Sequence, residues 1–162
     1  MPADERVTRS SFSDRIQPIS VPRVMPFLPR RIWSEGDWGR IQLGYCSRGM
    51  DEKWDVFAEG GVVFLHRSWT GNGVFAATFA PADGGGWQIA EAVVERDPER
   101  YRSNDDEYDC LMLELVLSAI VLGEPAKDLR ESLVELTRKR SGNAHVPAGA
   151  VQHSALGLRS GS

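Results

Sequence analysis

The stretch KWDVFAEGGVVFLHRSWTGNGVFAATF, residues 53–79, decides the fold of this chain. It contains three short runs rich in β-branched and aromatic residues, Trp54–Ala58, Val62–Trp69 and Val74–Ala80. The gaps between these runs hold Gly-Gly and Asn-Gly pairs, which tolerate the positive φ that tight hairpin turns require. The stretch therefore predicts three consecutive antiparallel strands.

Further strands are expected on either side of this stretch. Trp87–Glu95 is a fourth strand-like run, and it follows a turn-forming segment at Pro81–Gly86. Apolar and polar residues also alternate in Trp38–Tyr45, which suggests a fifth strand. We therefore expect an antiparallel β-meander of four to five strands.

Two helices are expected after the sheet. Asn104 is a candidate N-cap, with Glu107 in the capping-box position. The following run, Leu111–Leu122, is apolar on nearly every side and predicts a hydrophobic helix lying on the sheet. Ala126–Lys139 has a narrower apolar stripe and predicts an amphipathic helix. The expected fold class is α+β.

Both ends of the chain differ in composition from its centre. Residues 1–20 are polar without a sustained period, and residues 141–162 are rich in Gly and Ser, so both are expected to be flexible. A single α+β domain is expected over residues 21–140. At its start, the segment Ile19–Trp33 carries three prolines and is predicted to be extended. Its apolar side chains are expected to pack along the core: Val24, Met25, Phe27, Leu28 and Ile32.

Composition excludes several classes of protein. A chain of 162 residues with a net charge of −4 suits one acidic domain and disfavours a general nucleic-acid binder. Cys46 and Cys110 lie far apart without zinc-type spacing, so neither a metal nor a cofactor is expected. Leu111–Leu122 contains Glu114 and is too short to span a bilayer. The N-terminus shows no signal-peptide pattern, and we expect a cytoplasmic protein without membrane contact.

Polar side chains gather where the second strand of the stretch ends. Arginine offers a planar fork for phosphate or carboxylate, and tryptophan offers a face for stacking. Arg67 and Trp69 share a strand face, and the hairpin register places Lys53 opposite this end. The alternative is that Arg67 pairs with Glu91 or Asp55 and has only a structural role. The candidate ligand-binding residues are Lys53, His66, Arg67, Ser68, Trp69 and Thr70.

Direct evidence for catalysis is weaker. His66 is a weak candidate for a general base, because a histidine titrates near neutral pH. Ser68 lacks the surrounding GxSxG pattern of a hydrolase nucleophile. The acidic group within residues 105–109 is explained by its place at a helix N-terminus and does not indicate a metal site.

Met50–Gly71, reading MDEKWDVFAEGGVVFLHRSWTG, resembles a segment of small, uncharacterised bacterial proteins. In those proteins a Lys-Trp strand and a short turn precede a strand that ends His-Arg-Ser-Trp-Thr-Gly. The resemblance implies no particular activity, and it draws attention to residues 53–54 and 66–70.

These observations favour a small cytoplasmic binding or accessory protein. Its expected partner is an anionic small molecule or a protein, and an immunity-type or adaptor role fits the same features. One alternative is an enzyme acting on a nucleotide or phosphorylated substrate, with His66 as base and with Lys53 and Arg67 holding the anion. Another is a homodimer formed through the apolar run Leu111–Leu122.

Overall fold

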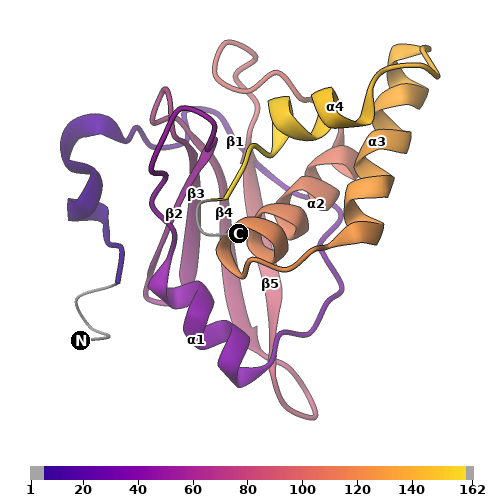
Figure 1. Cartoon of the computed structure of the whole chain (residues 1–162). Helices are drawn as coiled ribbons and strands as arrows, with labels where there is room; N and C mark the ends of the chain where they lie inside the picture. The colour runs from indigo at the N-terminus through magenta and orange to yellow at the C-terminus, as the bar shows by residue number, and fades with distance from the viewer. Residues whose placement is uncertain (1–5, 160–162) are drawn as a thin grey trace.

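The computed structural model describes residues 6–159 and shows one antiparallel sheet of five strands. The strands lie in the order β1-β5-β4-β3-β2, so the last four form the predicted meander (Figure 1). The strands are β1 (Pro22–Val24), β2 (Trp54–Glu59), β3 (Val62–Arg67), β4 (Gly73–Pro81) and β5 (Trp87–Glu95). The expected α+β class and antiparallel meander are confirmed.

Glycines make the tight turn between β2 and β3. Gly60 and Gly61 have φ values of 56° and 87°, which side chains with a Cβ rarely adopt. The resulting register pairs Trp54 with Arg67. The next residue outward, Ser68, donates its backbone N–H to the carbonyl of Lys53 at 2.9 Å. The expected placement of Lys53 opposite the end of β3 is therefore confirmed.

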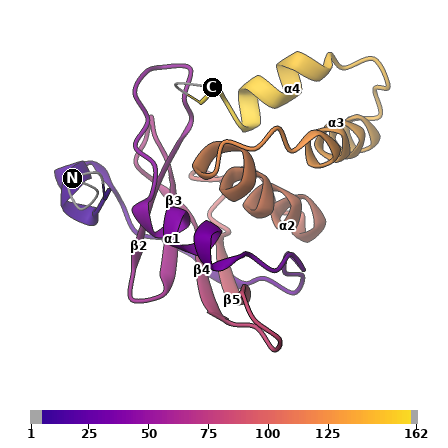
Figure 2. The same ribbon diagram turned by 60° about the horizontal axis from the view of Figure 1, so that its bottom comes forward.

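The helices α2, α3 and α4 lie on one side of the sheet, whereas the N-terminal segment lies on the other (Figures 1 and 2). The helices are α1 (Glu35–Leu43), α2 (Asp106–Leu115), α3 (Lys127–Ser141) and α4 (Ala148–Ala155). A π-helical segment, η3 (Val116–Val121), continues α2, and a 3-10 helix, η2 (Arg9–Arg15), precedes the sheet. In the part of the chain described, no helix combines the length and apolar character needed to cross a bilayer.

The apolar helix forms the centre of the core. Every residue of η3 is buried, together with Leu113 and Leu115 of α2 and Leu122 after η3. The sheet side of this core includes Val56, Leu65 and other side chains of the face that bears Trp54. The apolar surface that suggested a homodimer is thus covered largely by the chain's own elements.

The segment expected to be a fifth strand, Trp38–Tyr45, is a helix over most of its length. Ser34 caps α1 by accepting a hydrogen bond from the backbone N–H of Asp37 at 3.0 Å. Trp38 and Ile41, three residues apart, are its buried side chains. The prediction was wrong because a short run that alternates between apolar and polar residues also fits one helical face.

The fifth strand comes instead from the proline-rich segment. Residues 22–24 form β1, which pairs with β5 at the edge of the sheet, where proline is tolerated. Met25 is buried as expected. Val24, Phe27 and Ile32 are 62%, 57% and 50% exposed, so the expectation that they pack in the core was wrong.

The ends are more ordered than their composition suggested. Residues 148–155, expected to belong to a flexible tail, form α4, in which Val151 is buried; Leu156, immediately after the helix, is also buried. Phe12 of the expected N-terminal arm is buried and packs its ring 5.7 Å from that of Phe57. Residues 1–5 and 160–162 of these two predicted segments lie outside the described part of the chain.

Candidate functional site: an arginine-lined cavity

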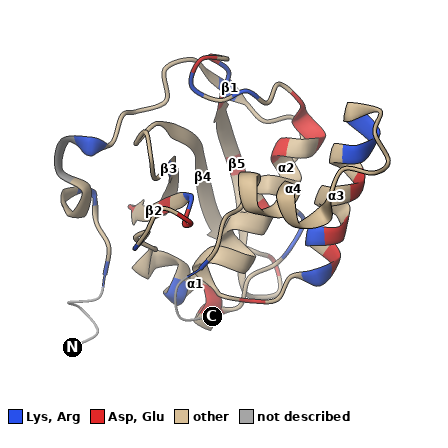
Figure 3. Cartoon of the chain, turned by 45° about the horizontal axis from the view of Figure 1, so that its top comes forward, with Lys and Arg blue, Asp and Glu red and all other residues tan. Residues whose placement is uncertain are grey.

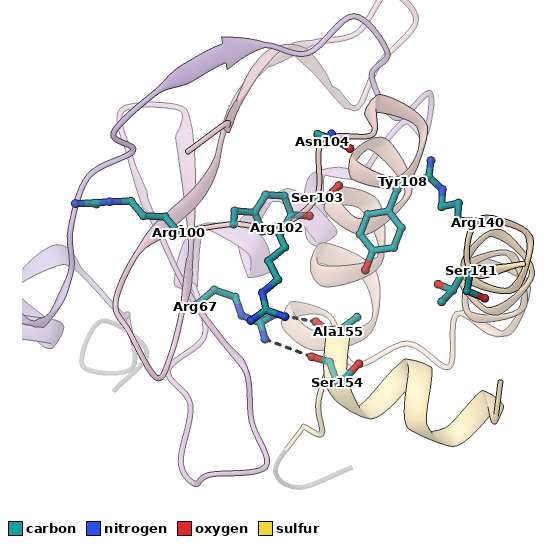
Figure 4. Close-up of a pocket in the computed structure, with 12 residues that line it drawn as sticks. Arg67, Arg100, Arg102, Ser103, Asn104, Tyr108, Arg140, Ser141, Ser154 and Ala155 are labelled. Carbon is teal, nitrogen blue, oxygen red and sulfur yellow. Dashed lines mark hydrogen bonds between the residues drawn. The ribbon is translucent and has the colours of Figure 1, made fainter. Parts of the chain in front are cut away.

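A cavity of about 760 Å³ lies between the end of β3, the loop before α2, and the helices α3 and α4 (Figure 4). Its volume is in the range of small-molecule sites. The lining residues come from all of these elements: Arg67, Arg100, Tyr101, Arg102, Ser103, Asn104, Tyr108, Thr137, Arg140, Ser141, Ser154 and Ala155.

Arg67 is the only predicted site residue that lines this cavity. Its Nη1 donates to the carbonyl of Ala155 at 2.9 Å and its Nη2 to that of Ser154 at 3.3 Å, as the dashed lines in Figure 4 show. The guanidinium also lies over the ring of Trp54, 4.9 Å from its centroid. Burial lowers the pKa of Arg67, and no carboxylate in the described part of the chain pairs with it. The alternative of an ion pair with Glu91 or Asp55 was therefore wrong.

A buried carboxylate holds the loop that carries several lining residues. Asp109 accepts hydrogen bonds from the Tyr101 hydroxyl at 2.9 Å and the Ser103 hydroxyl at 2.8 Å. It also accepts from Arg96 at 2.6 Å. Burial and the negative charge of Asp109 raise the pKa of Tyr101 well above its ordinary value, so this phenol stays neutral. The network fixes the loop against α2 and thereby positions Arg102 beside the cavity.

The N-terminus of α2 forms another part of the wall. Asp105, and not the predicted Asn104, is the N-cap, and its side chain accepts from the Tyr108 backbone N–H at 2.8 Å. The prediction was one residue early because both side chains suit this position. Asp105 also pairs with Arg140 near the end of α3. Figure 3 shows this basic end of α3 beside the acidic start of α2.

The four lining arginines differ in their surroundings. Arg102 is exposed and makes no ion pair with the described residues, and in Figure 4 it extends on the same side of the cavity as Arg67. Arg140 lines another side from α3, and in Figure 4 its side chain extends toward the start of α2, where it pairs with Asp105. Arg100 points away in this view, and its Nη1 donates to the Pro18 carbonyl at 3.4 Å. Three guanidinium groups therefore remain to act on a molecule in the cavity.

The cavity wall has the opposite charge to the chain as a whole. Four arginines and no Asp or Glu line it, although the net charge of the protein is −4. Burial raises the pKa of the Tyr108 phenol above its ordinary value, and the nearby positive charge of Arg67 offsets part of this rise. The remaining polar groups are neutral hydroxyls and an amide, which suit the oxygen atoms of an uncharged polar ligand portion.

His66 lies away from this cavity. Its side chain is buried, and its Nδ1 is 2.9 Å from the carbonyl oxygen of Gly71. Its ring stacks on Phe57, on the sheet face opposite Arg67. Burial lowers the pKa of His66. The geometry is that of a buried structural histidine, and it brings His66 to none of the cavity-lining groups.

The other predicted residues form a separate surface cluster. β3 ends before Ser68, so Trp69 does not continue the strand face of Arg67. Trp69 is 62% exposed, and its Nε1 donates to the Met50 carbonyl at 3.0 Å. The Lys53 Nζ lies 4.1 Å from the centroid of the Trp69 ring. Ser68 donates to the Glu52 carbonyl at 2.6 Å. The Thr70 hydroxyl accepts from the Asn72 backbone N–H at 3.2 Å, which supports the turn.

Sequence reasoning missed most of the cavity. Among its lining residues, the sequence drew attention only to Arg67, as a ligand-binding candidate, and to Asn104, as a helix cap. A signal did exist in the run RYRSN at 100–104, which places two arginines and three hydrogen-bonding side chains next to a helix start. Its meeting with Arg67 and Arg140 depends on the tertiary fold.

Comparison with known proteins adds no assignment. No family model, no curated protein and no solved structure matches this chain. The geometry and charge of the cavity are therefore the features that indicate a function.

Proposed function

We propose that the protein binds an anionic small molecule in the arginine-lined cavity. One observation carries this proposal: four arginines and no acidic side chain line a cavity of about 760 Å³ in an acidic protein. Positive side chains clustered in a cleft of a negatively charged protein create a positive local electrostatic potential, which attracts anions. The proposal keeps the expected ligand class and moves the site from the end of β3 to the cavity beside it.

The state of Arg67 gives a physical reason for anion affinity. This guanidinium is desolvated, and its present partners are two neutral backbone carbonyls. Hydrogen bonds between ionised partners are stronger than those with a neutral partner. An anion near Arg67 therefore gains interaction energy without displacing a carboxylate.

The proposal is tested with two cavity variants and a matched control. Arg102→Gln and Arg140→Gln each remove one positive charge from the wall, whereas Lys139→Gln removes one from an exposed neighbour that does not line the cavity. Sugar phosphates, nucleotides and dicarboxylates are screened by thermal shift, and positive results are measured by calorimetry. We expect weaker binding in the two cavity variants and unchanged binding in the control. Absence of stabilisation by all three compound classes, or equal losses in all three variants, contradicts the proposal.

The enzyme alternative has less support. His66 is its proposed base, but this residue is buried on the other sheet face and does not line the cavity. Lys53 also lies outside the cavity, where its ammonium makes a cation–π contact with the Trp69 ring. The cavity residues are suited to binding an anion. Among the described residues, no hydrogen bond joins a nucleophile to a general base within the cavity.

A second function, protein binding, is favoured by the cluster around Trp69. Trp69, Met50 and Leu158 are 62%, 74% and 56% exposed, and Met50 and Leu158 line one shallow hollow. Exposed aromatic and Met side chains beside cations are typical of interaction hot spots. This cluster retains the expected protein partner near the end of β3.

Photo-crosslinking tests the second function directly. A benzophenone amino acid replaces Met50 in the cell, and the same amino acid at exposed Asp83 serves as the control. We expect a discrete adduct only from position 50, lost when Trp69→Ala is added. An adduct that survives Trp69→Ala, or equal labelling from both positions, contradicts a partner site at this cluster.

A further inference from the structure

We infer that the ligand carries two separated anionic groups, such as the two phosphates of a bisphosphate, and that the cavity binds them on different walls. This inference rests on the proposed function and specifies its ligand class. It follows from where the three available guanidinium groups lie.

The first wall combines β3 with the loop before α2. Arg67 is held there by the two carbonyls at the end of α4, so its position is fixed. Arg102 extends on the same side in Figure 4 and has no ion-pair partner among the described residues. The fixed guanidinium of Arg67 and the exposed, unpaired guanidinium of Arg102 together provide the fork-like donors that a phosphate or carboxylate accepts.

The second wall is the end of α3. Arg140 lines the cavity there and pairs with Asp105. Asp105 is itself held by the backbone N–H of Tyr108 at 2.8 Å, so it keeps its place at the helix start. A guanidinium has five N–H donors, so even a two-point contact with the Asp105 carboxylate leaves three of them. Arg140 therefore retains donors for a second anionic group.

Neutral groups occupy the space between the walls. Tyr108 lies between Arg140 and the Arg67 side in Figure 4. Ser103, Asn104 and Thr137 add further uncharged polar side chains. This order of cation, neutral polar groups and cation matches a ligand with charged ends and a polar or hydroxylated middle.

Cavity size favours a ligand larger than a single anionic group. Ligand cavities of this class enclose molecules far larger than one phosphate group, and this one has about 760 Å³. A second group linked to the first binds at a high effective concentration, so its contact adds affinity at little further entropic cost.

The test uses flexible probes of one chemistry. A series of linear alkanediol bisphosphates of increasing chain length is compared with the matching alkyl monophosphates by calorimetry. We expect affinity to peak at one chain length, with the best bisphosphate binding about tenfold or more tighter than its monophosphate. Arg140→Gln is expected to remove most of this advantage and to weaken monophosphate binding far less than bisphosphate binding, whereas Arg102→Gln weakens both probes by similar factors. Lys139→Gln is the control for nonspecific attraction.

The outcomes separate this inference from the function on which it rests. If monophosphates bind as tightly as bisphosphates and only Arg102→Gln weakens them, the cavity holds one anion, and the two-group inference is overturned while the proposed function stands. If affinity rises steadily with charge, without a preferred length and with equal losses in Lys139→Gln, the attraction is nonspecific and overturns the inference. If neither probe binds at all, the proposed function itself fails for phosphates.

Discussion

The guanidinium of Arg67 donates a hydrogen bond of 2.9 Å to the carbonyl oxygen of Ala155, which lies 88 residues further along the chain. The same oxygen accepts from Trp54 Nε1 at 3.0 Å. The C-terminal end of a helix carries partial negative charge, which a buried cation stabilises. One side chain of β3 thus lines the cavity and also holds α4 against the sheet.

Arg67→Met is predicted to loosen α4. The variant keeps much of the apolar stem but removes the charged donors, and hydrogen bonds to charged groups contribute about 1.5–3 kcal/mol each. We expect a loss of about 2 kcal/mol in the free energy of unfolding, measured with urea. A protease of broad specificity is expected to cut within residues 142–147 faster than in the wild type. Unchanged cleavage would show that apolar contacts alone keep α4 docked.

Gly71→Ala is predicted to destabilise the fold more than Gly84→Ala. Both glycines have positive φ, 78° and 86°, so an alanine pays a similar backbone cost of about 1–2 kcal/mol at either position. A Cβ at Gly71 also overlaps the carbonyl of Arg15, whereas one at Gly84 meets nothing within 4 Å. Thermal unfolding of the two variants measures the difference. Equal melting temperatures would mean that the N-terminal segment moves aside without cost.

His66 is predicted to make stability depend on pH. Burial lowers the pKa of His66 below its ordinary value of 6.5, so the unfolded chain binds the proton more readily than the folded one. The contribution of His66 is therefore fully present above pH 6.5 and decreases as the pH falls below that value. In His66→Asn, whose amide retains a donor for the Gly71 carbonyl, urea titrations between about pH 7 and pH 5 are expected to show a shallower decline. An equal decline in both proteins would assign it to other groups.

Asp109→Asn is predicted to unfold the loop before α2 and thereby to weaken ligand binding in the cavity. Asp109 is fully buried and accepts from Arg96 at 2.6 Å, and removing one partner of a buried ion pair costs about 3–5 kcal/mol. Asp106→Asn is the matched control, because Asp106 also bonds Arg96, at 3.0 Å, from a more exposed position. We expect the control to lose less than about 1 kcal/mol. Similar unfolding free energies for the two variants would contradict this order.

The hairpins could be predicted from the sequence because their signals are local. The Gly60-Gly61 pair and the alternating faces of β2 and β3 lie within a few residues of one another. The register follows once the turn is placed, and it correctly set Lys53 against the end of β3. The apolar helix was equally clear, since its composition does not depend on which neighbour covers it.

The predictions were wrong for elements whose local sequence signals are weak. α1 depends on the Ser34 cap and on Trp38 fitting the core, neither of which a short alternating run can show. α4 has a Gly- and Ser-containing composition typical of a flexible segment, and it is ordered largely by contacts with distant residues such as Arg67 and Trp54. Local propensity was outweighed by tertiary packing in both cases.

The candidate site could be predicted only in part, for the same reason. Arg67 was correctly chosen as a cation at the end of a strand, but its neighbours in the cavity come from the loop before α2, from α3 and from α4. Trp69 was assigned to the same face because β3 was extended past Arg67, where the backbone in fact turns. A pattern in one strand cannot show which later segments come to cover it.

The long separation between Arg67 and α4 also bears on how the protein is made. Synthesis proceeds from the N-terminus at about 5–20 residues per second, so the hairpins leave the ribosome seconds before Ala155 does. During that interval the Arg67 guanidinium is hydrated, Trp54 Nε1 lacks its carbonyl partner, and the nascent sheet exposes the apolar face that the helices later cover. Chaperone capture and misassembly are therefore expected to concentrate on this late intermediate, and codon changes that slow translation of residues 142–155 should lower the soluble yield.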